Sequence, residues 1–219
     1  MISTIDWNKI ETVFLDLDGT LLDLHFDNHF WLEYVPVCYA DHHGMDLDRA
    51  TTHLMHRYSE VKGRLDWYCV EFWTKDLGLD IKQLKEEISH KIAVHSNVEI
   101  FLAKMNELEK RVVLVTNAHP VSYALKMEVT GLQKYFDNVV NAHDLSIAKE
   151  HDGFWQALQS VEPFRSESTL FIDDNEEVLA CAEKYGFIHL LSIVKPDSQK
   201  DGRQTSYYPM LSDFGDITP

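Results

Sequence analysis

The stretch VFLDLDGT at residues 13–20 decides the fold, because an apolar run passes directly into two aspartates that are two residues apart. The chain repeats this chemistry far downstream as FIDD at residues 171–174. Gly19 makes a tight turn after the first pair easy to form. In open α/β sheets ligands bind at the carboxyl ends of the strands, and clustered carboxylates there attract hard divalent cations. The two acidic pairs therefore predict one site for metal-assisted chemistry on a phosphate.

Length and charge limit the classes of protein and partner. A chain of 219 residues can bury one core and carry a smaller appended unit. The net charge of -16 is not offset by any basic cluster, which argues against a nucleic acid or an anionic membrane as partner. The N-terminus lacks a basic segment followed by an apolar one, and no run approaches membrane-spanning length. We therefore expect an unprocessed cytoplasmic protein.

The cysteines and histidines follow no metal-binding motif. Cys38, Cys69 and Cys181 are odd in number and lack CxxC spacing, so neither a disulfide framework nor a zinc knuckle is indicated. None of the twelve histidines belongs to an HExxH motif. This pattern favours surface or capping roles for most of them over metal ligation.

Short apolar runs alternate with helical patterns along most of the chain. Strands are predicted at residues 12–17, 111–116, 138–140, 169–172 and 187–193. Ser96 and Glu99 predict a capping box for one helix, while Pro120 and Gly131 predict the start and the stop of the next. Strand–helix alternation of this kind predicts a Rossmann-like α/β core, a parallel sheet with helices on both faces.

Residues 22–95 break this alternation, because they contain several helical patterns and no strand. Asp46, Asp66 and Asp80 are predicted N-caps of three of these helices. We therefore predict an inserted all-helical cap at 22–95 and a core formed by 1–21 and 96–219. Aromatic residues concentrate in the cap and predict the core of a small bundle, with one or two rings facing a ligand: Phe30, Trp31, Trp67, Tyr68, Phe72 and Trp73.

These segments carry a resemblance to a known family. DLDGT, VVLVTN at 112–117, Lys149 and FIDD resemble, in order and spacing, the four motifs of the haloacid-dehalogenase-like (HAD) hydrolase superfamily. The cap segments FDNHFW at 26–31, LDWYCVEFW at 65–73 and LGLDI are similar to its bacterial GMP/IMP nucleotidase branch, as are TNAHP and the PDS stretch. The resemblance implies a Mg²⁺-dependent 5'-nucleotidase whose partner is a small phosphate ester, a purine mononucleotide.

The resemblance also implies roles for the four aspartates. Asp16 is the expected nucleophile, which forms an aspartyl-phosphate. Asp18 is the expected acid and then base, with only its backbone carbonyl touching the metal. Asp173 completes the metal ligands together with Asp16, and Asp174 is a ligand through water or an orienting group.

Four further residues are expected to hold the phosphoryl oxygens. Thr116 donates a hydrogen bond, Lys149 supplies charge and restrains Asp16, and the backbone N–H groups of Asn117 and Ala118 add to the cradle. The family usually has proline after this lysine, and Glu150 stands there instead, so the loop is expected to be less preset.

The substrate base is expected to meet the cap. Asn28 is the polar candidate and Trp31 and Trp67 are the stacking candidates, since they lie in the segments shared with the nucleotidase branch. A hydrogen bond within the cap or packing in its core is an equally good interpretation of these residues.

Other functions stay open at this point. Dehalogenating members need neither a metal nor an acid two residues after the nucleophile, so Asp18 and FIDD favour phosphoryl transfer. A phosphomutase, or a phosphatase for a sugar phosphate or phosphoglycolate, is the nearest alternative. A catalytically idle binding scaffold is more remote, because it has no need of the whole motif set. The sequence leaves open the oligomeric state and the role of the tail at 195–219.

Overall fold

The computed structural model describes residues 5–219, so the first four residues of the predicted core segment 1–21 lie outside the described residues. The core is a six-stranded parallel sheet in the order β3-β2-β1-β4-β5-β6. Its strands are β1 (Thr12–Leu15), β2 (Arg111–Thr116), β3 (Asn138–Asn141), β4 (Thr169–Ile172), β5 (His189–Ile193) and β6 (Met210–Leu211). The predicted parallel α/β sheet is confirmed.

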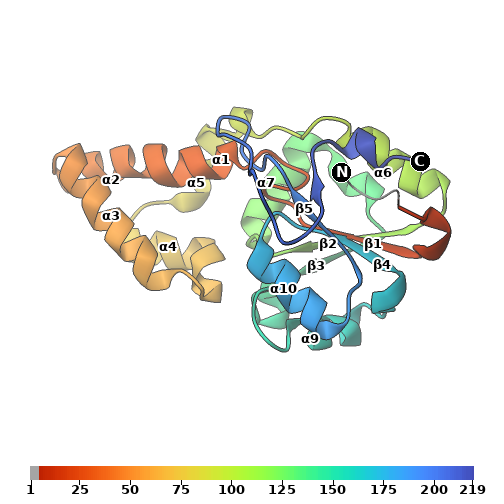
Figure 1. Cartoon of the computed structure of the whole chain (residues 1–219). Helices are drawn as coiled ribbons and strands as arrows, with labels where there is room; N and C mark the ends of the chain where they lie inside the picture. Colours follow the sequence, from red (N-terminus) through yellow and green to blue (C-terminus); the bar gives the residue numbers. More distant parts are fainter. Residues whose placement is uncertain (1–4) are drawn as a thin grey trace.

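Helices cover both faces of this sheet (Figure 1). Successive residues of a strand point to opposite faces, so Val13 and Leu15 of β1 share one buried cluster while Phe14 lies in another. The first cluster includes residues of α6 (Val98–Glu107) and α7 (Pro120–Thr130), and the second includes residues of α9 (Phe154–Val161) and α10 (Glu176–Tyr185). Burial on both sides explains why β1 reads as a continuous apolar run. Shorter turns complete the core: η1 (Trp7–Lys9), η5 (Leu132–Tyr135), α8 (Ala142–Leu145), η6 (Ser166–Ser168) and η7 (Phe214–Asp216).

The register of the central strands sets the position of the site. Leu15 at the end of β1 lies opposite Leu114 of β2 and Ile172 of β4. The ladder continues one residue further, because the N–H of Asp16 donates to the carbonyl of Ile172 at 3.0 Å. The residues that follow these strands therefore lie at one edge of the sheet.

Between β1 and α6 the chain forms the helical cap, which stands beside the sheet (Figure 1). The chain leaves and re-enters the core at adjacent points, since the N–H of Asp23 donates to Ala93 O and the N–H of His95 to Leu21 O, both at 2.9 Å. The division at 22–95 stays a prediction. The helices of the cap are α1 (His25–His29), the π-helix η2 (Phe30–Tyr34), α2 (Val35–His43), α3 (Leu47–Val61), η3 (Leu65–Tyr68), α4 (Val70–Leu77), α5 (Ile81–Glu87) and η4 (Ser89–Lys91).

Two of the three N-cap residues predicted for helices of the inserted cap are right. The carboxylates of Asp46 and Asp80 accept backbone N–H groups at 2.9 and 3.0 Å and cap α3 and α5, as predicted. The prediction for Asp66 is wrong, because Asp66 lies inside η3 and pairs with Arg64. The residue that caps α4 is Cys69, whose Sγ accepts the N–H of Phe72 at 3.4 Å.

Two further predictions in the core need correction. The Ser96–Glu99 capping box does not form, because Asn97 precedes α6 in a left-handed conformation and donates its amide to Asp213 at 2.6 Å. β6 has only two residues and follows an irregular segment, so no alternating pattern predicted it. Strand β1 also ends earlier than the predicted 12–17, because Asp16 already begins the turn through Gly19.

Candidate active site

The turn after β1 brings the first acidic pair against the second. Gly19 has φ of +87°, and a Cβ atom on it would lie 2.8 Å from the carboxylate carbon of Asp174. Only glycine fits this position, both for its backbone and for the close approach. The N–H of Asp174 donates to Thr20 Oγ1 at 3.1 Å, which ties the two strand-end loops together.

Lys149 lies between the two acidic pairs. Its Nζ donates to Asp16 Oδ1 at 2.5 Å, to Asp173 Oδ2 at 2.7 Å and to the carbonyl of Val115 at 3.1 Å. All three charged side chains are buried. Burial alone would lower the pKa of Lys149, but the two carboxylates outweigh it and raise that pKa, so the ammonium stays charged.

The carboxylates of Asp16, Asp173 and Asp174 offer oxygens that lie within 4.8 Å of one another. Burial raises the pKa of Asp16 to about 6, with Lys149 opposing and Asp173 adding to the rise. Burial and the charges of Asp173 and Asp16 also raise the pKa of Asp174 well above its usual value. Three crowded acids outnumber the two cations beside them, Lys149 and Arg203, and oxygen donors are what a hard cation prefers. This donor set fits a divalent ion such as Mg²⁺.

The residues after β2 form the wall beside Lys149. The N–H of Ala118 donates to Thr116 Oγ1 at 3.0 Å, so both predicted cradle groups are within reach of one another. The Asn117 side chain accepts the N–H of Lys149 at 2.9 Å. Asn117 therefore fixes the lysine loop from the neighbouring strand end.

Glu150 replaces the missing proline with hydrogen bonds. Asn117 Nδ2 donates to Glu150 Oε2 at 2.8 Å, and the hydroxyl of Tyr68 donates to Glu150 Oε1 at 3.0 Å. The loop that was expected to be less preset is thus held by side chains from both the core and the cap. Neither contact has a local sequence signal, because the partners are 33 and 82 residues away.

The sequence predictions did not include Lys126, which lies beneath Asp18. Its buried Nζ donates to Asp18 Oδ1 and to Asp27 Oδ2, both at 2.6 Å. Lys85 donates to the other oxygen of Asp27 at 3.1 Å. The carboxylate of Asp18 does not belong to the cluster of Asp16, Asp173 and Asp174. The sequence does hold a signal for Lys126: it follows Ser122 by four residues, so the helical repeat places this lysine on the buried face of α7.

The two carboxylates beside Lys126 differ in acidity. Burial raises the pKa of Asp18 to about 6, with Lys126 opposing and Asp27 adding to the rise. Burial acts the same way on Asp27, but Lys126 and Lys85 outweigh it and lower its pKa to about 2. Asp27 is therefore a permanent charge, whereas Asp18 can hold or release a proton near neutral pH.

A cavity of about 820 Å³ lies between the core and the cap. The strand-end residues Asp16, Asp18, Thr116, Asn117, Ala118, Lys149, Asp173 and Asp174 line one side, and the three cap candidates Asn28, Trp31 and Trp67 line the other. The structure therefore brings every predicted site residue to one cavity. Its size suits a small organic ligand.

Each cap candidate also makes contacts of its own. Asn28 Nδ2 donates to Asp197 Oδ2 at 2.7 Å. The rings of Trp31 and Trp67 meet the ring of Tyr58 edge-on, at centroid distances of 5.7 and 5.9 Å. The two tryptophans thus pack within the cap while they line the cavity, whereas Asn28 bonds to the 195–219 tail and not within the cap.

The tail at 195–219 contributes to the site as well. Arg203 lines the cavity and donates to the carbonyl of Asp174 at 2.5 Å and to Ser192 Oγ at 3.2 Å. Asp197 holds Asn28. The sequence left the role of this tail open, and the structure places it against the second acidic pair and the first cap helix.

Comparison with known proteins identifies the family of the chain. The family model of the haloacid dehalogenase-like hydrolases matches residues 10–186, and the chain belongs to this family. Among residues 5–219, no helix is both long and apolar enough to cross a membrane.

Particular relatives refine this placement. The chain is 35% identical over 215 residues to the GMP/IMP nucleotidase YrfG of Escherichia coli K12, covering 98% of this chain and 97% of the relative. The solved HAD phosphatase of Thermococcus onnurineus superposes with a TM-score of 0.79 at 20% identity, covering 95% and 96% of the two chains. The L-2-haloacid dehalogenase of Xanthobacter autotrophicus gives 0.64 at 14% identity, covering 95% and 97%. The two structural likenesses support the fold alone.

Proposed function

We propose that the protein is a Mg²⁺-dependent 5'-nucleotidase that hydrolyses GMP and IMP. The observation that carries the proposal is the buried Asp16–Lys149–Asp173 cluster, which faces a cavity with tryptophan rings on its opposite side. The likeness to the Escherichia coli GMP/IMP nucleotidase supports the choice of substrate.

Asp16 begins the reaction. Its free carboxylate oxygen attacks phosphorus in line, a bond forms between that oxygen and phosphorus, and the bond from phosphorus to the ribose 5'-oxygen breaks. Asp18 gives its proton to the leaving oxygen and the nucleoside departs. Lys149 holds the other oxygen of Asp16 at 2.5 Å, which restrains the nucleophile in one orientation.

Asp18 then acts as a base. It takes a proton from a water molecule that attacks the phosphorus of the aspartyl-phosphate, which releases orthophosphate and restores Asp16. A pKa of about 6 suits a group that must give a proton in one step and accept one in the next. Lys126 positions Asp18 for both steps through the contact at 2.6 Å.

The remaining polar groups bind charge. Thr116 and Lys149 contact the phosphoryl oxygens, and the N–H groups of Asn117 and Ala118 add to this cradle. Asp16, Asp173 and Asp174 would hold Mg²⁺ together with the backbone carbonyl of Asp18. When bound, the ion neutralises charge on the phosphoryl oxygens.

The cap selects the base. Trp31 and Trp67 can stack on a purine, because their rings line the cavity. The carboxylate of Asp197 only accepts hydrogen bonds, so it fixes the Asn28 amide with its NH₂ group toward Asp197 and leaves Oδ1 as an acceptor. A 6-oxopurine carries an N–H at N1 that can donate to this oxygen, whereas adenine carries an acceptor there.

A panel of phosphate esters at one Mg²⁺ concentration tests the proposal. We expect kcat/KM for GMP and IMP to exceed that for AMP, CMP, glucose 6-phosphate and phosphoglycolate by about tenfold or more, as expected for loss of one paired polar contact or one stacked ring. A hexose phosphate or phosphoglycolate as the best substrate would overturn the nucleotidase assignment and leave a phosphatase. No hydrolysis of any ester would favour the idle scaffold instead.

A further inference from the structure

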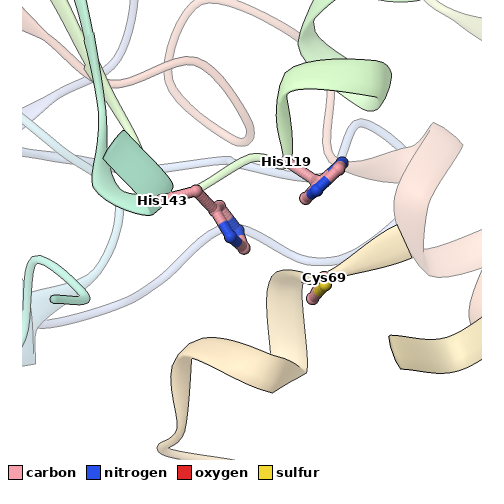
Figure 2. A group of neighbouring side chains, drawn as sticks. All are labelled: Cys69, His119 and His143. Carbon is pink, nitrogen blue, oxygen red and sulfur yellow. The ribbon is translucent and has the colours of Figure 1, made fainter. Parts of the chain in front are cut away.

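Three side chains that share no sequence motif meet where the cap contacts the core. Cys69 Sγ and one ring nitrogen each of His119 and His143 lie within 4.8 Å of one another. Figure 2 shows the thiol of Cys69, at the start of cap helix α4, facing the two imidazoles. His119 caps α7, and His143 lies in α8. The donors therefore come from both parts of the fold.

The donor set differs in kind from the carboxylates of the catalytic cluster. One sulfur and two imidazole nitrogens suit Zn²⁺ and related transition metals, whereas Mg²⁺ prefers oxygen. In a tetrahedral zinc site the donors lie about 3.3–3.8 Å from one another. Small side-chain movements would close the present spacing to that range. A fourth donor is at hand, because Glu71 Oε2 lies 2.7 Å from His119 Nε2 and 3.7 Å from Cys69 Sγ.

One ring nitrogen of His143 lacks a hydrogen-bond partner among the described residues. His143 Nε2 is buried and has no hydrogen-bond partner within residues 5–219. Its own backbone is fixed, since its N–H donates to Asn141 Oδ1 at 2.9 Å. A buried polar atom without a partner costs free energy, and a metal ion would satisfy it.

The protonation states of the two imidazoles favour ligation. Burial lowers the pKa of His143, and the neighbouring His119 lowers it further. Burial also lowers the pKa of His119, although Glu71 opposes the change. Both imidazoles are therefore neutral at neutral pH, which is the form that binds metals. Burial raises the pKa of the Cys69 thiol, so the metal would have to displace the thiol proton on binding.

We propose that Cys69, His119 and His143 form a second metal site, which binds Zn²⁺ or a similar transition metal and ties the cap to the core. Substrate entry and product release through the cavity require these two parts to separate. Because the ion has ligands on both, it slows that separation. The site is distinct from the carboxylate cluster and does not depend on which phosphate ester the enzyme hydrolyses.

Cobalt titration of the full-length protein tests the site directly. Co²⁺ bound to a thiolate gives a charge-transfer absorption in the near ultraviolet, which carboxylate ligands do not give. We expect this band to saturate at one Co²⁺ per chain, to vanish in Cys69→Ser and to weaken strongly in His143→Gln. It should persist in Asp173→Asn, which disrupts the catalytic cluster, and in Cys38→Ser, a matched control because Cys38 is the other half-buried cap thiol. Absence of the band in the parent protein, or its persistence in Cys69→Ser, would overturn the proposal.

Turnover of an aryl phosphate at saturating Mg²⁺ tests the tie between cap and core. We expect stoichiometric Zn²⁺ to slow the parent enzyme severalfold and to leave the rate of Cys69→Ser unchanged by zinc. Equal slowing of both would place the inhibiting ion elsewhere and overturn the tie. Because an aryl phosphate needs no base recognition, this result does not depend on the nucleotidase assignment.

Discussion

The two sides of the cavity are built by different forces. On the core side, buried charges fix one another: Lys149 joins Asp16 to Asp173 at 2.5 and 2.7 Å. On the cap side, Trp31 and Trp67 are half-buried and meet Tyr58 edge-on, and Trp31 lies tilted against Trp73. Removing one partner of a buried ion pair costs about 3–5 kcal/mol, whereas an aromatic pair is worth about 0.5–1.5 kcal/mol beyond its burial. The catalytic cluster is therefore rigid and suited to chemistry, and the two tryptophans can adapt to the substrate.

The largest effect should follow from Asp16→Asn, which keeps the shape of the side chain and removes the nucleophile. We expect kcat to fall by roughly three or more orders of magnitude, as for loss of a covalent nucleophile. Steady-state kinetics with circular dichroism measures this, and Asp144→Asn, an exposed aspartate near the same edge of the sheet, is the control. A folded Asp16→Asn protein with near-normal turnover would contradict the mechanism.

Removal of the metal should abolish activity through the core side of the cavity and leave the cap unchanged. The crowded Asp16, Asp173 and Asp174 need a cation to bind an anionic phosphate, so exhaustive EDTA treatment should abolish activity and added Mg²⁺ should restore it. Asp173→Ala should weaken the affinity for Mg²⁺ severely in a titration of activity. Full activity after chelation would show that this cluster does not work through a metal.

Substitution of Lys126 tests whether a buried charge outside the four motifs contributes to catalysis. Lys126→Met leaves Asp18 and Asp27 without their shared cation, so we expect kcat to fall roughly tenfold to hundredfold, with KM changing less. Protein stability should fall as well. The double variant Lys126→Met, Asp18→Asn should recover part of that stability, because Asp27 keeps its ion pair with Lys85 and the orphaned Asp18 charge is removed. A Lys126→Met enzyme with parental kcat would show that Lys126 has no part in positioning Asp18.

The cap side should respond in KM. Base stacking is worth about 1–3 kcal/mol, so Trp31→Ala or Trp67→Ala should raise KM for GMP by roughly tenfold and leave KM for an aryl phosphate nearly unchanged. Phe72→Ala is the matched control, because this cap ring does not line the cavity. Equal changes for both substrates would mean that the tryptophans hold the shape of the cap and do not contact the base.

The smallest effect concerns stability and pH. The pKa of Asp16 rises from 3.8 to about 6 on folding, so the stability gained from its protonated form is complete below pH 3.8 and is lost as pH rises through 6. Above that pH the charged cluster can bind Mg²⁺. At about 100-fold excess over Kd, Mg²⁺ should add about 2.7 kcal/mol, several degrees in Tm, at pH 7.5 and much less at pH 5. Thermal unfolding with and without Mg²⁺ measures this rise in Tm. A larger rise in Tm at pH 5 than at pH 7.5 would contradict the prediction.

The sequence predicted what depends on neighbouring residues. The strands and their terminal aspartates were found because an apolar run and the acids that follow it lie together in the chain. Lys126 was missed because it meets Asp18 from 108 residues away, and Cys69 and His143 meet only through the packing of the cap on the core. Even local capping failed where a distant partner competed, as at Asn97, which bonds to Asp213.

The most direct test of the account is to look for phosphate on Asp16 during turnover of GMP. Rapid acid quenching followed by mass spectrometry of the peptides would detect an acyl phosphate formed within the first turnover. We predict one phosphate on the peptide that contains Asp16 in the parent enzyme and none in Asp16→Asn. Turnover of GMP with the phosphate on a different residue, or with no covalent phosphate at any quench time, would contradict the central claim.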